Sequence, residues 1–297
     1  MNISKPIGFL ICASVATTVF FVRCTKNNPQ PPKTDTIIAH DTTTDTLYAT
    51  KPDPTVNLAK GLLLYLPFNG SIADSSGNSN PTQAIGGTVL GSDGHGYANS
   101  AFTANGGGQA VLVTNNGSIK FDTAYSVSID FMTLDLSSRH NYIAMVDYAT
   151  GFGPTFAMGT VVPANTSLFD VGVNDTTIEC SDWGTGNPTN VNDTTTFVPQ
   201  LSRWYNAIIT YHRDSLKIYI NGSLIGSKVG IGHLANLCPS SSVVIGSWWQ
   251  SDPSNVNGAI DNVRMYNRVL TPHEIAALAS NYSPTSNSVK ATPKTAH

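Results

Sequence analysis

The sequence predicts an all-β protein built as an antiparallel two-sheet sandwich with one short C-terminal helix. Charged residues make up only 12% of the 297 residues, and polarity comes instead from Ser, Thr, Asn and Gly. Short apolar runs recur between turn signals, which is typical of many short strands. Residues 125–134 alternate with a period of two: Val127, Ile129 and Phe131 share one face, and Asp130 lies on the other. One dry face and one wet face are what a strand of an antiparallel sandwich requires.

Residues 1–23 have the layout of an export signal. Lys5 precedes an uncharged apolar run of 16 residues, 7–22, which is shorter than the roughly 20 residues of a typical membrane span. The run ends at Arg23-Cys24 and resembles a bacterial lipoprotein signal, in which Cys24 would be lipidated. Arg23 departs from that pattern, where a small residue is usual. We expect a membrane-anchored lipoprotein at the outer membrane or cell surface; a cleaved secretion signal and a retained anchor are the alternatives.

The rest of the chain divides into three parts. Residues 24–56 are rich in Pro, Thr, Asp and Lys and contain few large apolar side chains, so they predict a disordered tether. Residues 283–297 are similarly polar and predict a disordered tail. Residues 57–282 hold the apolar runs and predict a single domain, since all-β domains reach this length.

Ten runs within this domain predict strands. They cover residues 61–68, 110–114, 125–134, 142–148, 155–162, 168–173, 204–211, 216–220, 243–248 and 259–266. Asn221-Gly222 predicts a type I′ hairpin turn, because both residues accept positive φ there. Thr271 and Glu274 predict the capping box of a helix over residues 271–278, with Pro272 at its first position.

Composition excludes several classes of protein. With only two Glu, Glu179 and Glu274, the chain cannot be a coiled coil or a helical repeat array. Its 40% of apolar residues excludes a wholly disordered chain. Lys and Arg number 16 against 19 Asp and Glu, which gives a net charge of −3. No basic surplus is present, so we expect no nucleic-acid partner.

Three motifs occur in a fixed order along the domain. They are residues 66–70 and 74–78 (LPFNG and DSSGN), Trp204 with residues 219–222 (YING), and residues 258–270 (GAIDNVRMYNRVL). Together they resemble the laminin-G-like domains of the concanavalin A-like lectin/glucanase superfamily over residues 61–278. The resemblance implies a jelly-roll sandwich. It implies less about function, because the superfamily includes lectins, enzyme-attached modules and adhesive domains.

A carbohydrate site needs an aromatic ring that stacks on a sugar face and polar groups that bind the hydroxyls. Two segments predicted as loops offer both: Trp249 with Gln250 and Asp252, and Trp183 with Asp182. Binding residues concentrate in loops. We therefore predict that these five residues bind carbohydrate or a glycoconjugate.

The other tryptophans are expected to pack. Neighbouring residues of a strand point to opposite faces, so one of Trp248 and Trp249 should enter the core and the other should be exposed. Packing of both rings at the rim is the alternative. Trp204 precedes an apolar strand and is expected in the core.

The resemblance also implies one structural calcium ion, held by carboxylate and carbonyl oxygens. The matching positions are Asp74, Gly77 or Asn78, and Asp261. The alternative is an Asx turn at Asp74 and backbone amide partners for Asp261. The seven His residues lack the spacing of a transition-metal site.

Cys180 and Cys238 are the two cysteines of the predicted domain. An exported protein with an even cysteine count allows a disulfide between them. The spacing does not show that they meet, so buried free thiols are equally compatible with the sequence.

Glycoside hydrolysis is the competing chemistry, because glucanases share the sandwich. The Glu-x-Asp-x-Glu arrangement of those enzymes is absent, and Glu274 is assigned to the helix cap. Glu179 and Asp182 are three residues apart and would face opposite ways in a strand. We therefore expect a binding module and not an enzyme. A non-catalytic adhesive or structural surface domain is the alternative function, and a glycoside hydrolase is the third.

Overall fold

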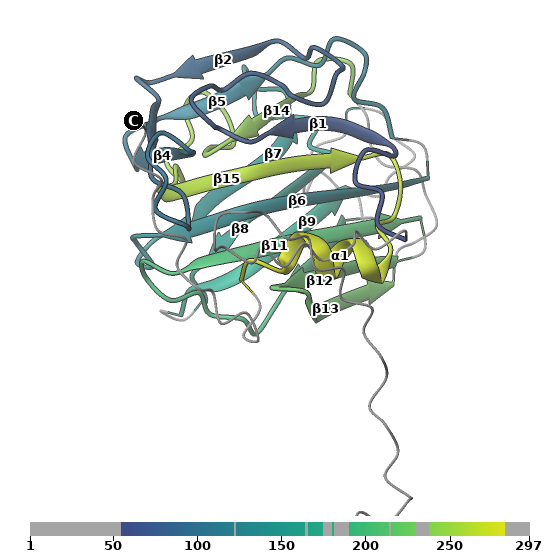
Figure 1. Ribbon diagram of the computed structural model, residues 1–297. Helices are drawn as coiled ribbons and strands as arrows, with labels where there is room; N and C mark the ends of the chain where they lie inside the picture. The colour runs from purple at the N-terminus through teal and green to yellow at the C-terminus, as the bar shows by residue number, and fades with distance from the viewer. Residues whose placement is uncertain are drawn as a thin grey trace, which may run out of the picture. The chain divides into compact units, whose positions relative to one another are not determined.

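The computed structural model describes residues 55–121, 123–163, 166–174, 180, 190–213, 215–229 and 238–282. These residues form two antiparallel sheets packed face to face, with one helix on the outer side of one sheet (Figure 1). The predicted all-β sandwich is confirmed. No helix in the described ranges is long and apolar enough to cross a membrane. The predicted signal peptide, Cys24, nearly all of the tether and the tail lie outside the described residues.

The first sheet has eight strands in the order β13-β12-β11-β6-β15-β4-β3, and β1 pairs with β15 beside β4. The strands are β1 (Leu62–Leu66), β3 (Val89–Gly91), β4 (Ala101–Asn105), β6 (Ala124–Thr133), β11 (Trp204–His212), β12 (Ser215–Ile220), β13 (Ser223–Val229) and β15 (Asn257–Tyr266). The first and last strands of the domain therefore lie side by side within this sheet.

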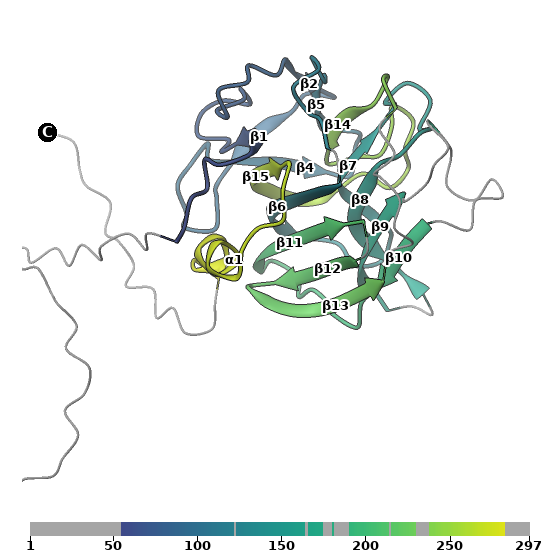
Figure 2. The ribbon, with the colours of Figure 1, turned by 90° about the vertical axis from the view of Figure 1, so that its right-hand side faces the viewer.

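The second sheet has seven strands in the order β10-β9-β8-β7-β14-β5-β2. The strands are β2 (Thr82–Ile85), β5 (Ala110–Val113), β7 (His140–Val146), β8 (Phe156–Val161), β9 (Leu168–Asn174), β10 (Asn190–Thr194) and β14 (Ser242–Ile245). Seen from the side, the two sheets form adjacent layers (Figure 2).

The core lies between the sheets and is rich in aromatic side chains. Val127, Ile129 and Phe131 of β6 are fully buried there, as their alternation predicts. The Phe131 ring lies 4.6 Å from that of Tyr142 and 5.5 Å from that of Phe169, measured between centroids. Both of those residues belong to the opposite sheet, so Phe131 joins the two layers.

The other face of β6 is also buried, which the alternation did not predict. Ser126 and Asp130 are 0% and 3% exposed. The Ser126 hydroxyl donates to the Arg268 carbonyl at 2.8 Å and accepts from the Leu270 amide at 3.1 Å. The expected wet face is wrong because the C-terminal segment folds over it.

The turn between β12 and β13 has the predicted geometry. Asn221 and Gly222 have φ values of 49° and 79°. Two successive residues with positive φ match the twist of a two-residue hairpin, so the type I′ turn is confirmed.

Helix α1 (Pro272–Ala279) begins at the predicted capping box. The Thr271 side chain accepts from the Glu274 amide, and the Glu274 carboxylate accepts from the Thr271 amide. Arg268 also donates to both Glu274 oxygens, at 2.6 and 2.7 Å. These contacts, led by the hydrogen bonds from Arg268, lower the pKa of Glu274 to about 2.

Candidate functional site

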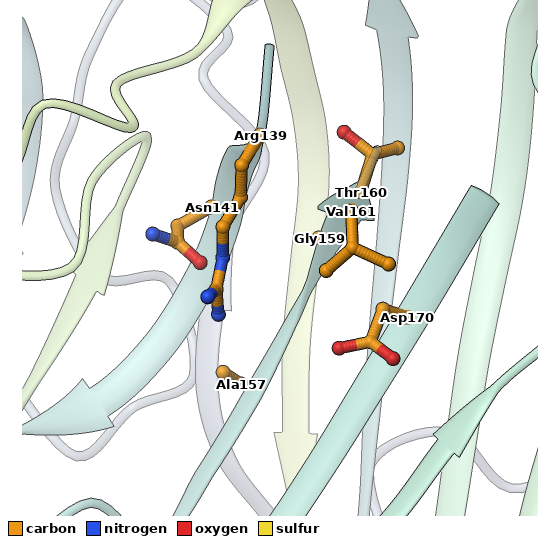
Figure 3. Close-up of a pocket in the computed structure, with 7 residues that line it drawn as sticks. All are labelled: Arg139, Asn141, Ala157, Gly159, Thr160, Val161 and Asp170. Carbon is orange, nitrogen blue, oxygen red and sulfur yellow. The ribbon is translucent and has the colours of Figure 1, made fainter. Parts of the chain in front are cut away.

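A pocket of about 240 Å³ lies between β7 and the segment that follows β14. We call it the Arg139 pocket; it is lined by Arg139, Asn141, Trp248, Asp252 and Ser254. A depression that shares Arg139 and Asn141 continues from it across β8 and β9 (Figure 3).

The depression is on the outer face of the seven-stranded sheet. Asp170 lines it and alternates along β9 with Phe169 and Val171, whose side chains are in the core. Pairing across the strands places Asn141 opposite Gly159 and Gly159 opposite Asp170. A Cβ at Gly159 would collide with a backbone carbonyl of β7, so only glycine fits there. Gly159 therefore contributes no side chain between the Asn141 amide and the Asp170 carboxylate.

Asp252 orients two walls of the Arg139 pocket. One of its oxygens accepts from the Asn141 side chain at 2.8 Å and from the Trp248 amide at 2.7 Å. The other accepts from the Ser254 amide at 2.8 Å. Asp252 is only 8% exposed. It holds the amide and the indole in place, and the direct ligand contact predicted for it stays a prediction.

Arg139 is the exposed cation of the pocket. Within the described part of the chain its guanidinium forms no hydrogen bond or ion pair. In Figure 3 the side chain runs past Asn141 towards Ala157. A guanidinium has five N–H donors in a planar fork, so it can bind hydroxyl, carboxylate or phosphate oxygens.

Neither tryptophan after β14 enters the core, so the expectation of one core and one exposed ring is wrong. Gly246, with φ of +87°, ends the strand, and the alternation of faces ends with it. Both rings are half-buried. Trp248 packs on a small apolar cluster on the outer face of the sheet, and its Nε1 donates to the Gly151 carbonyl at 3.1 Å. Trp249 lies against the same glycine, and Trp248 is the one that lines the pocket.

The remaining predicted binding residues have different outcomes. Gln250 is exposed, and its side-chain amide donates to the Ala149 carbonyl at 2.8 Å. Trp183 and Asp182 lie outside the described residues. Their contacts with carbohydrate stay predictions.

Trp204 is not a core residue, contrary to expectation. It is half-buried at the start of β11, and its ring lies beside Gly94. The next residue, Tyr205, is the one that faces the core. The apolar run indicated the strand correctly but not which residues face inward.

Asp74 has the contacts of an Asx turn. Its carboxylate accepts from the amides of Tyr65, Ser76 and Asn80 at 2.9 to 3.1 Å. Burial would raise the pKa of Asp74, but these hydrogen bonds outweigh it and lower the pKa.

Asn78, next to Gly77, donates from its side-chain amide to carbonyls of β1. No group of three His, Cys, Asp or Glu is placed to hold a metal among the described residues. Calcium stays a prediction.

Asp261, the last residue of the predicted calcium set, faces another carboxylate. It pairs with Asp130 across β15 and β6, on the outer face of the eight-stranded sheet, and each is 3% exposed. The Asn262 side chain donates to both at 3.0 Å, and Asn206 donates to Asp130 at 2.7 Å. Burial raises the pKa of Asp130 to about 7 and that of Asp261 to about 8. This pair is too enclosed to act on a substrate.

Cys180 and Cys238 form a disulfide, with their Cα atoms 4.6 Å apart. The structure thus decides between the two states that the sequence left open. The disulfide packs against the backbone of Gly153, in the turn between β7 and β8.

A family model described as the concanavalin A-like lectin/glucanases superfamily, for laminin-G-like domains, matches residues 105–276. The chain belongs to the concanavalin A-like lectin/glucanase superfamily. Among curated proteins, this superfamily member has no significant match.

Solved structures share the fold of this superfamily member at low identity. Domain 4 of AbnA, a GH43 extracellular arabinanase from Geobacillus stearothermophilus solved with arabinotriose, is 20% identical, with a TM-score of 0.55, over 73% of this chain and 98% of that chain. The binding domain of Paraclostridial Mosquitocidal Protein 1 is 18% identical, with a TM-score of 0.56, over 76% and 53%. The binding domain of botulinum neurotoxin DC, solved with SialylT, is 16% identical, with a TM-score of 0.53, over 77% and 53%. The chain thus spans about half of the two toxin domains.

Proposed function

We propose that this protein is a non-catalytic, extracytoplasmic binding module that recognises carbohydrate or a glycoconjugate through the Arg139 pocket. The observation that carries the proposal is the composition of that pocket: an exposed guanidinium, an oriented amide and the indole of Trp248 meet in one cavity. Sugars combine apolar C–H faces with hydroxyls, and pockets that bind small ligands combine apolar walls with a few placed polar groups in this way. The arabinotriose and SialylT complexes of the similar domains support a glycan as the ligand class.

Two carboxylates, those of Asp252 and Glu274, are already engaged within the protein, which favours binding over hydrolysis. Asp252 uses both oxygens on N–H donors within the protein, which suits a positioning role. Glu274 is held by Arg268 and the helix cap, on the outer side of the other sheet. An adhesive surface domain without a sugar site is the alternative function, and a glycan screen separates the two.

Replacing Arg139 with Gln is expected to weaken glycan binding at least tenfold, about 1.4 kcal/mol, because the replacement removes the free guanidinium. The melting temperature should not change, since that guanidinium forms no hydrogen bond within the described residues. Trp248→Ala should also weaken binding. The measurement is a glycan array of residues 24–297, with and without calcium, followed by calorimetric titration of the strongest glycan.

Lys217→Gln is the matched control, because it removes an exposed positive charge from β12 in the other sheet. It should bind as the wild type does. Normal binding by both the Arg139 and the Trp248 variants would place the site elsewhere, and no glycan binding at all would favour the adhesive function.

The proposed membrane attachment rests on the Arg23-Cys24 junction. Cys24→Ser should leave an unprocessed or soluble product, because the thiol that takes the lipid is gone. Fractionation of cells that express both forms measures this. A Cys24→Ser product of mature mass that still sediments with membranes would contradict lipidation at this residue.

A further inference from the structure

The turn between β7 and β8, residues 147–154, carries an exposed phenylalanine, Phe152, and contacts Trp248 of the Arg139 pocket. The Phe152 side chain is 57% exposed. Single apolar residues on a surface are common and need no explanation by themselves. Phe152 differs because the backbone on both sides of it is held by three independent sets of contacts.

The first set closes the turn on itself. The Asp147 carboxylate accepts from the Ala149 amide at 2.9 Å, and the Asp147 carbonyl accepts from the Gly151 amide at 2.7 Å. The Asp147 amide donates to the Phe152 carbonyl at 3.1 Å. The Phe152 amide donates to the Thr150 hydroxyl at 3.3 Å.

The second set ties the turn to the segment that lines the pocket. The Trp248 indole donates to the Gly151 carbonyl at 3.1 Å. Gln250 donates its backbone amide to the Tyr148 carbonyl at 3.1 Å and its side-chain amide to the Ala149 carbonyl at 2.8 Å. The residue before Phe152 is therefore in direct contact with a wall of the pocket.

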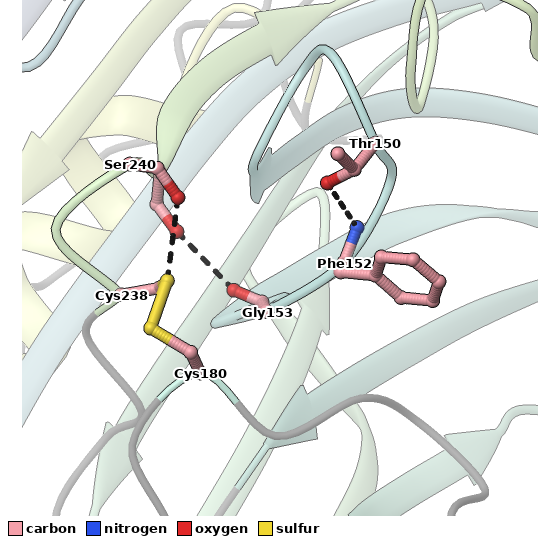
Figure 4. The surroundings of a disulfide bond; sticks show 7 residues. Thr150, Phe152, Gly153, Cys180, Cys238 and Ser240 are labelled. Atoms are coloured by element: carbon pink, nitrogen blue, oxygen red, sulfur yellow. Dashed lines mark hydrogen bonds between the residues drawn. A yellow bond between two sulfur atoms is a disulfide. The ribbon is translucent and has the colours of Figure 1, made fainter.

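The third set comes from the disulfide. A Cβ at Gly153 would lie 3.0 Å from the Cβ of Cys238, so the disulfide packs directly on the backbone after Phe152. The Ser241 hydroxyl donates to the Gly153 carbonyl at 3.2 Å. In Figure 4 the Phe152 ring points away from the disulfide.

We propose that Phe152 is a second aromatic subsite of the glycan site, so that the preferred ligand is an oligosaccharide and not a single sugar. This inference rests on the proposed function. A backbone held in place before binding loses little conformational entropy when a ligand stacks on the ring that it carries. Because Gly151 joins the Phe152 backbone to Trp248, a chain of sugars that enters the Arg139 pocket can continue onto Phe152.

The test compares sugars of different length. An array carries the mono-, di- and trisaccharides of arabinose, glucose, galactose and sialic acid, and titration follows on those that bind. Phe152→Ala should weaken trisaccharide binding about fivefold, as expected for the loss of one aromatic contact. Its monosaccharide affinity should not change. Phe152→Tyr should retain trisaccharide binding, and the Cys180→Ser/Cys238→Ser variant, measured while folded, should weaken it.

Leu224→Ala is the matched control, because Leu224 is 55% exposed and lies on β13 of the other sheet. It should leave all affinities unchanged. Unchanged trisaccharide binding by Phe152→Ala, with Arg139→Gln still impaired, would overturn the subsite and leave the proposed function standing. Equal wild-type affinity for mono- and trisaccharides would also overturn it. Normal binding by Arg139→Gln, or no wild-type binding to any sugar, would overturn both.

Discussion

Replacing Cys180 and Cys238 with serine is expected to lower the free energy of unfolding by up to about 4 kcal/mol. The disulfide joins positions 58 residues apart. A crosslink of this span removes chain entropy from the unfolded state, and the native state keeps its other contacts. Urea unfolding of wild type and double variant, followed by tryptophan fluorescence, measures the difference.

Ser240→Ala is the control for this experiment, because Ser240 lies 3.4 Å from the Cys238 sulfur and is not part of the crosslink. It should unfold at nearly the wild-type urea concentration. The reduced wild type should unfold like the double variant. Identical midpoints for the oxidised wild type and the double variant would show that the disulfide does not constrain the unfolded chain.

The sequence predicted the elements whose signals are local. The capping box depends on Thr271 and Glu274, three residues apart, and the hairpin turn depends on two adjacent residues. Alternation in residues 125–134 predicted the core face of β6 for the same reason, since every second side chain of a strand faces one way. Each of these signals is complete within a few positions, and each is confirmed.

The strands that sequence reasoning missed have little local signal. β2, β3 and β10 are end strands of their sheets, and β3 spans three residues. β4 has one large apolar side chain, that of Phe102. Such segments become strands because a neighbouring strand offers hydrogen bonds, and that neighbour is distant in sequence. The buried second face of β6 depends in the same way on Arg268 and Leu270, over 140 residues further along the chain.

Most residues of the candidate site also lack a local signal in the sequence. Asp252 was predicted, but Arg139, Asn141 and Asp170 were missed, because the pairing of β7, β8 and β9 brings them together. A signal was present: Asp170 is a charged residue inside the run Leu168–Asn174, which otherwise predicts a buried strand. A polar side chain on the outer face of such a strand needs a partner or a ligand.

The largest effect of pH on stability should come from Asp130 and Asp261. Burial raises the pKa of both carboxyls, to about 7 and about 8, and the charge of Asp130 further raises the pKa of Asp261. In the unfolded chain, Asp ionises near pH 4. The folded state therefore keeps protons that the unfolded state has released.

This difference in bound protons makes the folded protein less stable as pH rises. The stabilising contribution is fully present below about pH 4 and is lost as pH rises through the folded pKa values of about 7 and 8. Each unit of pKa difference corresponds to about 1.4 kcal/mol. Asp135 and Glu274 act in the opposite direction, because their pKa values are lowered to about 2. They lose stabilisation only as pH falls towards that value, so the range from pH 5 to pH 8 isolates the buried pair.

The variant that tests this pair is Asp130→Asn, with melting temperatures measured from pH 5 to pH 8 in EDTA. In the wild type, two carboxylates face each other and Asn206 donates to Asp130. The new side chain keeps one oxygen that can accept from Asn206 and carries no charge, so the repulsion with Asp261 at high pH is removed, while its NH2 group replaces the oxygen that accepts from Asn262. We expect the wild type to melt lower at pH 8 than at pH 5, and the variant to melt higher than the wild type at pH 8, by on the order of 5 °C.

The EDTA removes any cation that would neutralise the pair instead of a proton. Ser126→Ala, four residues earlier on the same buried face and hydrogen-bonded to Arg268 and Leu270 outside the carboxyl pair, is the control and should keep the wild-type pH dependence. Parallel curves for the wild type and the Asp130 variant would mean that these carboxyls do not hold a proton in the folded protein.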